Sequence, residues 1–245
     1  MERNFKLCET ITGFPLEVKA LYTTRLGGVS KPPFYSFNLG DHVNDDFTSV
    51  QCNRQKLEAY LKTPVVFMNQ THSTSVKQVF KKGETPVLAD GIVTTQKNLT
   101  LAVMTADCLP LLLASADGKV VGAIHCGWRG LAFGIVENAL KLIRTLSNSE
   151  ILAYTGACIA KNSYEVGGEL VEQFSRVCNN AKESFVKKDN DKFLCDLPSL
   201  CKSILEQNEV SIIGQSPYDT YLDKQFFSYR REHITGRQAT LISIC

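Results

Sequence analysis

The most pronounced apolar pattern lies near the middle of the chain, where two apolar runs, LPLLLAS and KVVGAI, flank the pair Asp117-Gly118. An Asp-Gly pair between two runs of β-type residues is a strong short-range signal for a β-hairpin. If this pair is the centre of the turn, Pro110 lies opposite His125. The pattern therefore predicts a hairpin with a defined register.

This register brings Cys108 and His125 onto one face of the hairpin. Successive side chains of a strand point to opposite faces, and Cys108 lies two residues before Pro110. The two side chains are then diagonal neighbours, roughly 7–8 Å apart at the backbone, whereas a slip of one residue would separate them. We therefore expect a thiol and an imidazole to converge on a metal ion or on a shared proton.

Periodicities along the rest of the chain predict alternating strands and helices. Helices are predicted at 47–62 with Thr48 or Ser49 as the cap, at 131–146, at 169–179, and from Pro198 to Gln207 with Asp196 as the cap. Strands are predicted at 16–24, 65–68, 76–80, 92–95, 99–105, 151–155, 193–195, 210–213, 226–231 and 239–244.

The order of these elements predicts the fold class. Strands and helices are interleaved, but several strand pairs are joined by short turns, which favours mixed sheets flanked by helices, a mixed α/β or α+β fold, over a purely parallel sheet. The chain shows no internal repeat, low-complexity segment or linker, so we expect one domain over residues 1–245.

Composition narrows the classes of function. The formal net charge is +2, with 44% hydrophobic and 21% charged residues, so bulk electrostatics does not indicate a nucleic-acid or membrane partner. No apolar run approaches the roughly 18–20 residues that span a bilayer. The first residues, MERNFKLCETITGF, lack the apolar core of a secretory signal. We expect a cytoplasmic protein that is a monomer or a small homo-oligomer.

Cysteine and histidine usage selects one candidate site. The nine cysteines are scattered without a C-x-x-C pair, and most are expected to be reduced and packed as small hydrophobic residues. Only four histidines are present. His72 and His125, with Cys108, form a donor set typical of a catalytic zinc site with one open position, although spacing this long also allows a packed cysteine with two hydrogen-bonded histidines.

A second interpretation uses Cys108 and His125 as a nucleophile and base. A thiolate beside an imidazolium can attack a carbonyl, with backbone amides such as those of Gly127 and Gly130 holding the oxyanion. Asp107 or Asp90 would orient the histidine. The sequence alone does not distinguish this dyad from the metal site, because both need a reactive thiol and an imidazole.

Two arginine-containing segments are candidates for anion binding. GWRG, which contains Arg129, opens a predicted helix, and free amides at a helix start favour anions. SYRRE and TGRQ bring Arg230 and Arg237 close in sequence, and arginines hold phosphate or carboxylate. Solvated arginines in a tight turn or on an edge strand are the structural alternatives.

Motifs along nearly the whole chain resemble the YfiH-type family, also called laccase-domain or polyphenol-oxidase proteins. They are TTRLGGVS, SFNLGDHVNDD, NQTHSTSV, ADGIVT, TADCLPLLL, GAIHCGWRG, GACIAKNSYEVG and FFSYRRE with TGRQATLI. The resemblance implies a single domain with mixed sheets, a fold shared with cysteine-hydrolase-like proteins.

The resemblance also implies an activity and a ligand set. Family members are described as purine nucleoside phosphorylases that convert adenosine, inosine and methylthioadenosine to base and sugar 1-phosphate, with adenosine deaminase activity. Their metal ligands correspond to His72, Cys108 and His125. Zinc is the usual metal, and copper is found in some members.

We assign further roles within this activity as expectations. Asp107 or Asp90 would move protons in deamination. Arg129 and Arg230 would hold phosphate, and Asn38 and Asn69 would bind the sugar hydroxyls.

The family also supports other functions. One is a Cys/His amidase that edits a cytoplasmic peptidoglycan precursor, and another is a single-copper polyphenol oxidase or a non-enzymatic metal-binding protein. A multicopper oxidase needs a histidine-rich cluster besides its blue-copper site, and four histidines cannot build both.

Overall fold

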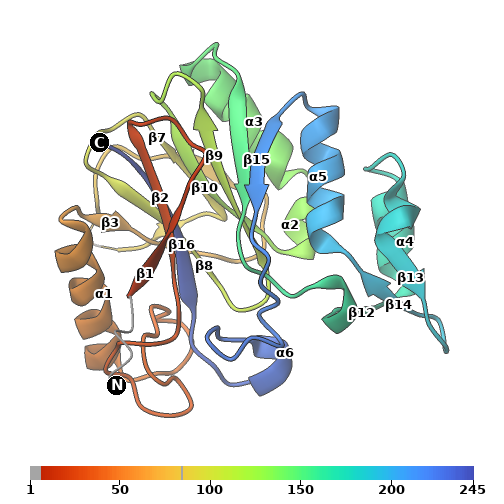
Figure 1. Cartoon of the computed structure of the whole chain (residues 1–245), viewed down its shortest axis with the longest axis horizontal. Coiled ribbons are helices and arrows are strands. Elements are labelled where there is room, and N and C mark those ends of the chain that lie inside the picture. Colours follow the sequence, from red (N-terminus) through yellow and green to blue (C-terminus); the bar gives the residue numbers. More distant parts are fainter. Residues whose placement is uncertain (1–6, 84) are drawn as a thin grey trace.

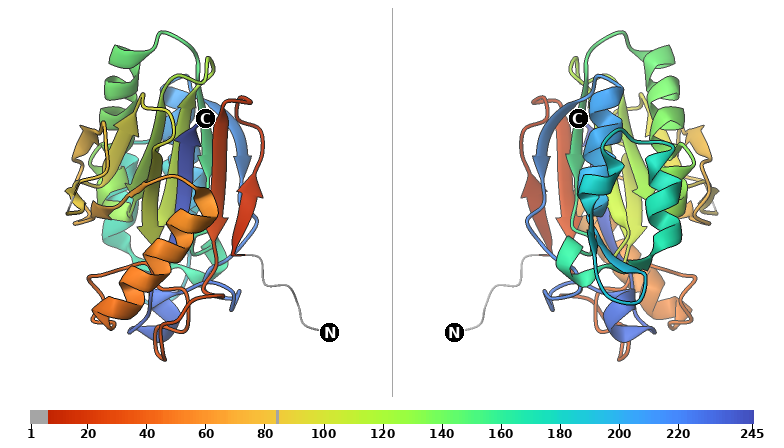
Figure 2. Two further views of the ribbon diagram at one scale, coloured as in Figure 1. Left: turned by 90° about the vertical axis from the view of Figure 1, so that its left-hand side faces the viewer. Right: turned by 90° about the vertical axis from the view of Figure 1, so that its right-hand side faces the viewer.

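Two β-sheets packed face to face, with helices on both outer faces, form the body of the molecule (Figures 1 and 2). The computed structural model describes residues 7–83 and 85–245. Apolar side chains from both sheets, including Val103, Leu112 and Ile242, form one buried cluster between them. The order from one outer face to the other is helix, sheet, sheet, helix, and the predicted mixed α/β class is confirmed.

The first sheet has five strands in the order β1-β2-β16-β8-β3. Its strands are β1 (Cys8–Ile11), β2 (Val18–Thr23), β3 (Val65–Val66), β8 (Thr100–Thr105) and β16 (Gln238–Ile244). The pairs are antiparallel except β3 with β8. Its outer face packs against Leu57 of helix α1 (Phe47–Leu61) and against Phe37 of the preceding loop.

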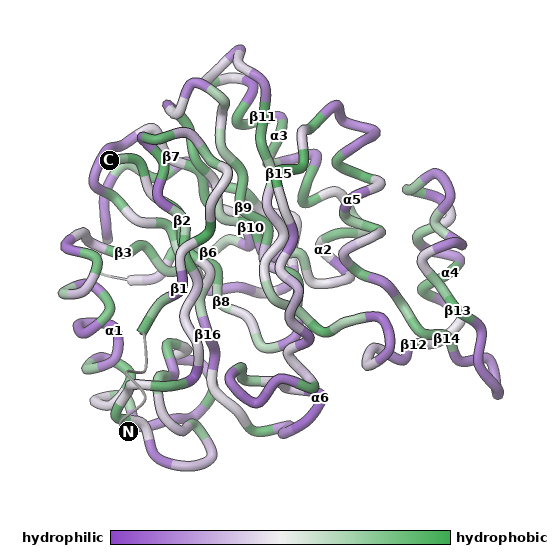
Figure 3. Tube along the Cα trace, in the orientation of Figure 1, coloured by the Kyte–Doolittle hydropathy of each residue, from purple (hydrophilic) through white to green (hydrophobic). Residues whose placement is uncertain are grey.

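The second sheet has six strands in the order β15-β11-β9-β10-β7-β5. Its strands are β5 (Val76–Gln78), β7 (Gly91–Thr94), β9 (Leu109–Ser115), β10 (Val121–Cys126), β11 (Ile151–Thr155) and β15 (Ser211–Gln215). Every residue of β9 and β10 is buried, and apolar residues follow these central strands (Figure 3).

Helices cover the outer face of this second sheet. They are α2 (Trp128–Ala132), α3 (Ile135–Leu146) and α5 (Leu197–Gln207), and their apolar sides join Leu111 and Ile124 in the largest core cluster. Beyond α5 lie α4 (Gly168–Ser175) and a three-stranded sheet, with the 3-10 turns η1 (Lys161–Ser163) and η2 (Ala181–Ser184) (Figure 1). The remaining strands are β12 (Glu165–Gly167), β13 (Phe185–Lys187), β14 (Lys192–Cys195), and the pair β4 (Met68–Asn69) and β6 (Val87–Leu88).

The predicted central hairpin is confirmed in its register. Strands β9 and β10 pair antiparallel with His125 opposite Pro110, and Asp117-Gly118 lies in the turn between them. Gly118 has φ +67°, a conformation that glycine adopts at little cost. The hairpin lies in the middle of the sheet, because β7 and β11 pair with its outer edges.

Several other predictions need correction. The helix predicted at 131–146 is two helices, because Gly134 adopts φ +96° between α2 and α3. The strand predicted at 226–231 is replaced by the helix α6 (Tyr229–Glu232), whose first turn is capped by the Ser228 hydroxyl. Helix α1 is capped by Asp46, which accepts the Ser49 N–H at 2.8 Å, and not by Thr48 or Ser49. None of the described helices is long and apolar enough to cross a membrane.

Candidate metal centre

Three predicted ligands meet where the chain passes from one sheet to the other. After β8, residues Ala106-Asp107-Cys108 lead from the five-stranded sheet into β9 of the six-stranded sheet. His125 comes from β10, and His72 from the loop after β4. The hairpin register therefore places Cys108 beside His125, and the third ligand arrives from a segment that is distant in sequence.

The geometry of this cluster suits a metal ion. One donor atom from each of His72, Cys108 and His125 lies within 4.8 Å of the others. The Cys108 Sγ atom is 3.7 Å from the His72 Nε2 atom, and the two imidazole rings meet edge to face with centroids 4.7 Å apart. Among the described residues it is the one group of three or more His, Cys, Asp or Glu side chains that could hold a metal.

Asp90 organises the cluster from behind. Its buried carboxylate lies 2.8 Å from the His125 Nδ1 atom, so that Nε2 faces the cluster. The same carboxylate accepts the backbone N–H of His72 at 2.9 Å and that of Ser73 at 2.8 Å, as well as the Ser73 hydroxyl at 2.7 Å. One aspartate therefore orients one candidate ligand and fixes the loop that carries another, as carboxylates hydrogen-bonded to ligating histidines do at metal sites.

Mutual electrostatics tunes the thiol and the imidazole. Burial alone would raise the pKa of the Cys108 thiol, but the His125 and His72 rings outweigh burial and lower this pKa to about 6. Burial would lower the pKa of His125, yet the Cys108 thiolate and the Asp90 carboxylate raise it to about 9. The pKa of Asp90 is lowered, because its hydrogen bonds with His125 and Ser73 outweigh burial.

Gly127 is required by close packing at the cluster. A Cβ atom at this position would lie 2.7 Å from the His72 Cδ2 atom and 3.5 Å from the Cys108 Sγ atom. Real Cβ atoms do not approach ring carbons this closely, so a side chain at Gly127 would displace His72. The glycine of the GWRG motif therefore makes room for a ligand.

The cluster forms one wall of a pocket of about 270 Å³. Arg237, Tyr229, His42 and Gln70 also line this pocket. The amide of Gln70 donates to the Met104 carbonyl at 2.8 Å and accepts the Met104 N–H at 2.9 Å, which ties the β4 loop to β8. Burial lowers the pKa of Arg237, an effect that the Cys108 and Asp107 charges oppose.

The structure places the predicted substrate-binding residues outside this pocket lining. Arg129 is exposed and stacks on Trp128, with its guanidinium carbon 4.6 Å from the ring centroid. The Arg230 guanidinium donates to the Glu165 carbonyl at 3.2 Å. Asn69 is exposed on β4.

Asn38 is fully buried and its amide is already engaged. Its Nδ2 atom donates to the Gly40 carbonyl at 3.0 Å and to Asp45 at 2.9 Å, and its Oδ1 atom accepts the N–H of Gly40 at 2.9 Å and that of Arg237 at 2.8 Å. This side chain therefore supports the Arg237 backbone and has no donor left for a sugar hydroxyl.

Asp107 lies next to Cys108 but engages other groups. Its carboxylate accepts the Thr220 hydroxyl at 2.7 Å and the Arg230 backbone N–H at 2.7 Å. These contacts attach the start of α6, and with it Tyr229, to the strand crossing. Of the two candidate carboxylates, Asp90 is the one that contacts the histidine.

Three residues of the pocket lining are not predicted from the sequence as site residues: Gln70, Arg237 and Tyr229. Gln70 lies in the same NQTH segment as His72. Its polar side chain two positions from a candidate ligand is the feature of the sequence that could have indicated its place in the pocket. Arg237 belongs to the arginine-rich segment at the end of the chain, in which the sequence analysis assigns phosphate binding to Arg230. Tyr229 lies in the strand predicted at 226–231, and its place in the pocket lining depends on the helix that the structure shows instead.

Several known proteins resemble this chain over most of its length. A protein-family model described as multi-copper polyphenol oxidoreductase laccase matches residues 19–245. A protein of Haemophilus influenzae named purine nucleoside phosphorylase is 38% identical over 233 residues, covering 93% of this chain and 95% of that protein. One of Escherichia coli K12, named purine nucleoside phosphorylase YfiH, is 37% identical over 231 residues, covering 93% and 94%.

Solved structures show the same architecture. A crystal structure of a Neisseria meningitidis protein superposes with a TM-score of 0.92 at 36% identity, over 98% of this chain and 99% of that one. A Bacillus licheniformis hypothetical protein YfiH gives a TM-score of 0.88 at 30% identity, over 93% of each chain. The chain therefore belongs to the laccase-like, YfiH-type family.

Proposed function

We propose that this protein is a metal-dependent purine nucleoside phosphorylase. The observation that carries the proposal is the His72–Cys108–His125 cluster, backed by Asp90, in the wall of a pocket that Arg237 also lines. The names of the relatives that share most of their length with this chain support the substrate class.

The donor set fits zinc. Two imidazole nitrogens and one thiolate are zinc ligands with a position left open, and the lowered pKa of the Cys108 thiol favours the deprotonated form that binds a metal. Copper(II) accepts the same donors. When bound, the metal supplies a Lewis acid that polarises an oxygen atom in the pocket.

The residues of the chain bind and orient the substrates in this proposal. The Arg237 guanidinium provides the positive charge in the lining that would hold phosphate. The exposed Tyr229 ring offers a face for stacking of the purine. Asn38 acts through the Arg237 backbone, and Asp107 acts by holding α6 in place. In phosphorolysis the phosphate oxygen bonds to the sugar C1 atom as the bond to the base nitrogen breaks, and the base takes up a proton.

Adenosine deamination is the second activity proposed for this site. Water replaces the amino group of the ring, giving inosine and ammonia. The pocket lining contains polar side chains that could contact a purine ring, among them His42 and Gln70.

The decisive experiment separates these activities. Zinc-loaded and copper-loaded protein are incubated with adenosine, inosine or methylthioadenosine, with and without phosphate, and the products are identified by mass spectrometry. Base and sugar 1-phosphate should form only with phosphate, and inosine should form from adenosine without it. Undiminished turnover after complete removal of the metal would contradict the metal-dependent proposal.

One observation favours a second candidate, a cysteine hydrolase. Cys108, His125 and Asp90 form a chain of thiol, imidazole and carboxylate, and the thiol pKa is lowered to about 6, as in cysteine nucleophiles paired with histidine. The Cys108 thiolate would attack the amide carbonyl of a peptidoglycan precursor and form a thioester as the C–N bond breaks. The amine would leave with a proton from His125, and water would then hydrolyse the thioester to the acid. A covalent adduct on Cys108 after incubation of metal-free protein with such an amide would support this candidate, and its absence together with nucleoside turnover would reject it.

A further inference from the structure

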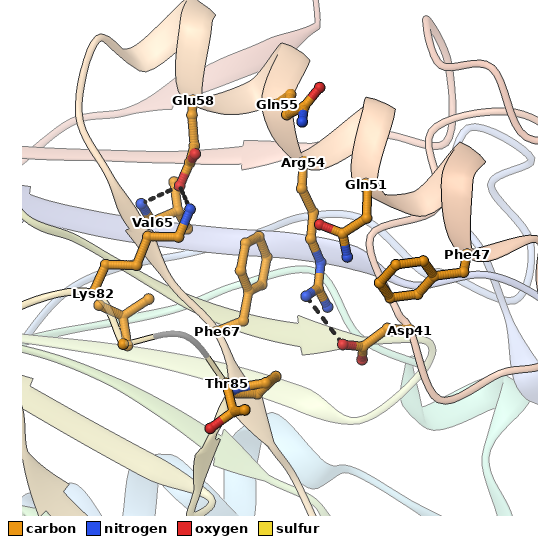
Figure 4. Close-up of a pocket in the computed structure, with 13 residues that line it drawn as sticks. Asp41, Phe47, Gln51, Arg54, Gln55, Glu58, Val65, Phe67, Lys82 and Thr85 are labelled. Atoms are coloured by element: carbon orange, nitrogen blue, oxygen red, sulfur yellow. Dashed lines mark hydrogen bonds and ion pairs between the residues drawn. The ribbon is translucent and has the colours of Figure 1, made fainter.

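A second pocket lies on the other side of the loop that carries Asp41 and His42. Its volume is about 490 Å³, a size that accommodates a small organic ligand. One wall is a face of α1, which contributes Phe47, Gln51, Arg54, Gln55 and Glu58 at helical spacing. The opposite wall contains Phe67 and Lys82 (Figure 4).

The two pockets meet at one dipeptide. Asp41 lines the second pocket, and His42 lines the pocket of the metal centre. The His42 Nδ1 atom is 3.6 Å from the Asp41 carboxylate. A ligand in the second pocket would therefore lie beside the metal centre without contacting the three metal ligands.

One buried guanidinium nitrogen of Arg54, which lines this pocket, has no hydrogen-bond acceptor among the described residues. Arg54 is only 9% exposed. Its Nε atom donates to the Leu39 carbonyl at 2.9 Å, and its Nη1 atom pairs with Asp41 at 3.1 Å. The Nη2 atom has no hydrogen-bond partner among the described residues, although it is buried. Because a buried polar group without a partner costs free energy, this nitrogen indicates an acceptor atom that a ligand would supply.

The charges of the pocket favour a neutral ligand over an anion. Arg54 is paired with Asp41, and the Lys82 ammonium lies 2.6 Å from the Glu58 carboxylate. Among the described residues of the lining, the two cations are thus matched by two carboxylates, and an anion would be placed next to both of these carboxylates. A carbonyl oxygen can accept from Nη2 without adding a charge.

Aromatic rings at the pocket favour a planar ligand. The Arg54 guanidinium already stacks on the Phe67 ring, 4.1 Å from its centroid. Phe47 is 67% exposed at the start of α1, and its ring points toward the same space as the Arg54 and Gln51 side chains (Figure 4). An exposed ring of this kind gains from stacking on a flat heterocycle. The Gln51 amide offers both a donor and an acceptor.

We propose that this pocket binds a neutral planar heterocycle that carries a ring carbonyl next to an N–H, such as an oxopurine. The carbonyl accepts from Arg54 Nη2, Gln51 pairs with the neighbouring N–H, and the ring stacks on Phe47. The proposal concerns binding at a site separate from the metal centre and does not depend on turnover there.

Calorimetric titration of the full, metal-loaded chain with hypoxanthine, without phosphate or nucleoside, tests the proposal. Unsubstituted purine, which lacks the carbonyl, is the ligand control and should bind at least about tenfold more weakly. Phe47→Ala and Arg54→Lys should each weaken hypoxanthine binding about tenfold. Tyr60→Ala is the matched control, because Tyr60 is a half-exposed aromatic residue on α1 outside the pocket lining.

Tyr229→Ala locates the ligand, because Tyr229 lines only the pocket of the metal centre. Hypoxanthine affinity that is unchanged in Tyr229→Ala but reduced in Phe47→Ala supports the second pocket. Lack of binding to the wild-type chain, equal affinity for purine, or a loss in Tyr229→Ala with no change in Phe47→Ala would each overturn the proposal. Should Arg54→Lys fail to fold, Phe47→Ala and the comparison of the two ligands decide the question, since neither disturbs a buried residue.

Discussion

The carboxylate of Asp90 lies 2.8 Å from the Nδ1 atom of His125. Because Asp90 also accepts the backbone N–H of His72 at 2.9 Å, it connects two proposed metal ligands that are 53 positions apart in the sequence. This relationship fixes the orientation of the His125 ring and the position of the His72 loop together.

Replacement of Asp90 with Asn should therefore weaken metal binding. An amide keeps the volume but donates where the carboxylate accepts, and loss of such an outer partner reduces metal affinity by about 10–100-fold. A competition titration with a chromogenic zinc chelator measures the change. Asp117→Asn, in the hairpin turn away from the site, should bind zinc as the wild type does. Equal zinc affinity in Asp90→Asn and wild type would argue against this part of the site.

Gly127→Ala should reduce zinc occupancy through His72 alone. The added methyl group would lie 2.7 Å from the His72 ring, which must then leave its position. Metal content after dialysis, measured by atomic emission, should fall well below one equivalent. Gly83→Ala is the control, because its Cβ would meet its nearest neighbour, the Thr85 carbonyl, at 3.6 Å, an ordinary contact. Full zinc occupancy in Gly127→Ala would contradict this prediction, because it would show that the loop with His72 can shift and His72 can still bind zinc.

The reactivity of Cys108 in metal-free protein should follow its lowered pKa. A thiolate is the reactive form, and the folded-state pKa of about 6 lies below the ordinary cysteine value, so the thiolate is populated above about pH 6. The rate of iodoacetamide labelling at Cys108, followed by peptide mass spectrometry, should rise through this pH and level off by neutrality. His125→Gln removes the imidazolium and should move the midpoint upward. A wild-type midpoint near that of a free thiol, about 8.5, would contradict the pairing.

Arg237→Met should raise the KM for phosphate in phosphorolysis by about tenfold or more, because a charged donor in the pocket is lost. Arg176→Met, on the exposed end of α4, should leave this KM unchanged. Initial rates at varied phosphate concentration provide the measurement. Arg230→Met distinguishes the roles of the two arginines. A larger rise in the KM for phosphate in Arg230→Met than in Arg237→Met would show that Arg230 binds phosphate, as expected from the sequence.

The sequence predicted the central part of the molecule well for a local reason. The register of the hairpin depends on the Asp117-Gly118 turn and on the alternation of neighbouring side chains, both of which are short-range properties. The helix Leu197–Gln207 was predicted from its Asp196 cap, which accepts the Ser199 N–H at 3.1 Å. Both elements are therefore specified by residues within or next to them, which a sequence alone reveals.

Two of the errors involve long-range contacts, and one involves a local backbone conformation. Tyr229 begins a helix of one turn, because Ser228 caps it and Asp107, 123 positions away, accepts the Arg230 N–H at 2.7 Å. The break between α2 and α3 depends on a left-handed Gly134 that periodicity does not reveal. Arg237 was ranked below Arg230 because their relation to the pocket depends on the crossing between the two sheets.

The hydrogen bonds of Asp90 also bear on the thermodynamics of metal uptake. Small zinc domains remain unfolded without their metal, because ordering of the ligands and binding occur in one step. Here the backbone amides of residues 71–73 are anchored to a carboxylate from another segment, and His125 belongs to a fully buried strand. The entropy of fixing these two side chains is therefore lost when the chain folds. For the proposed metal site, we expect metal exchange to be separate from unfolding.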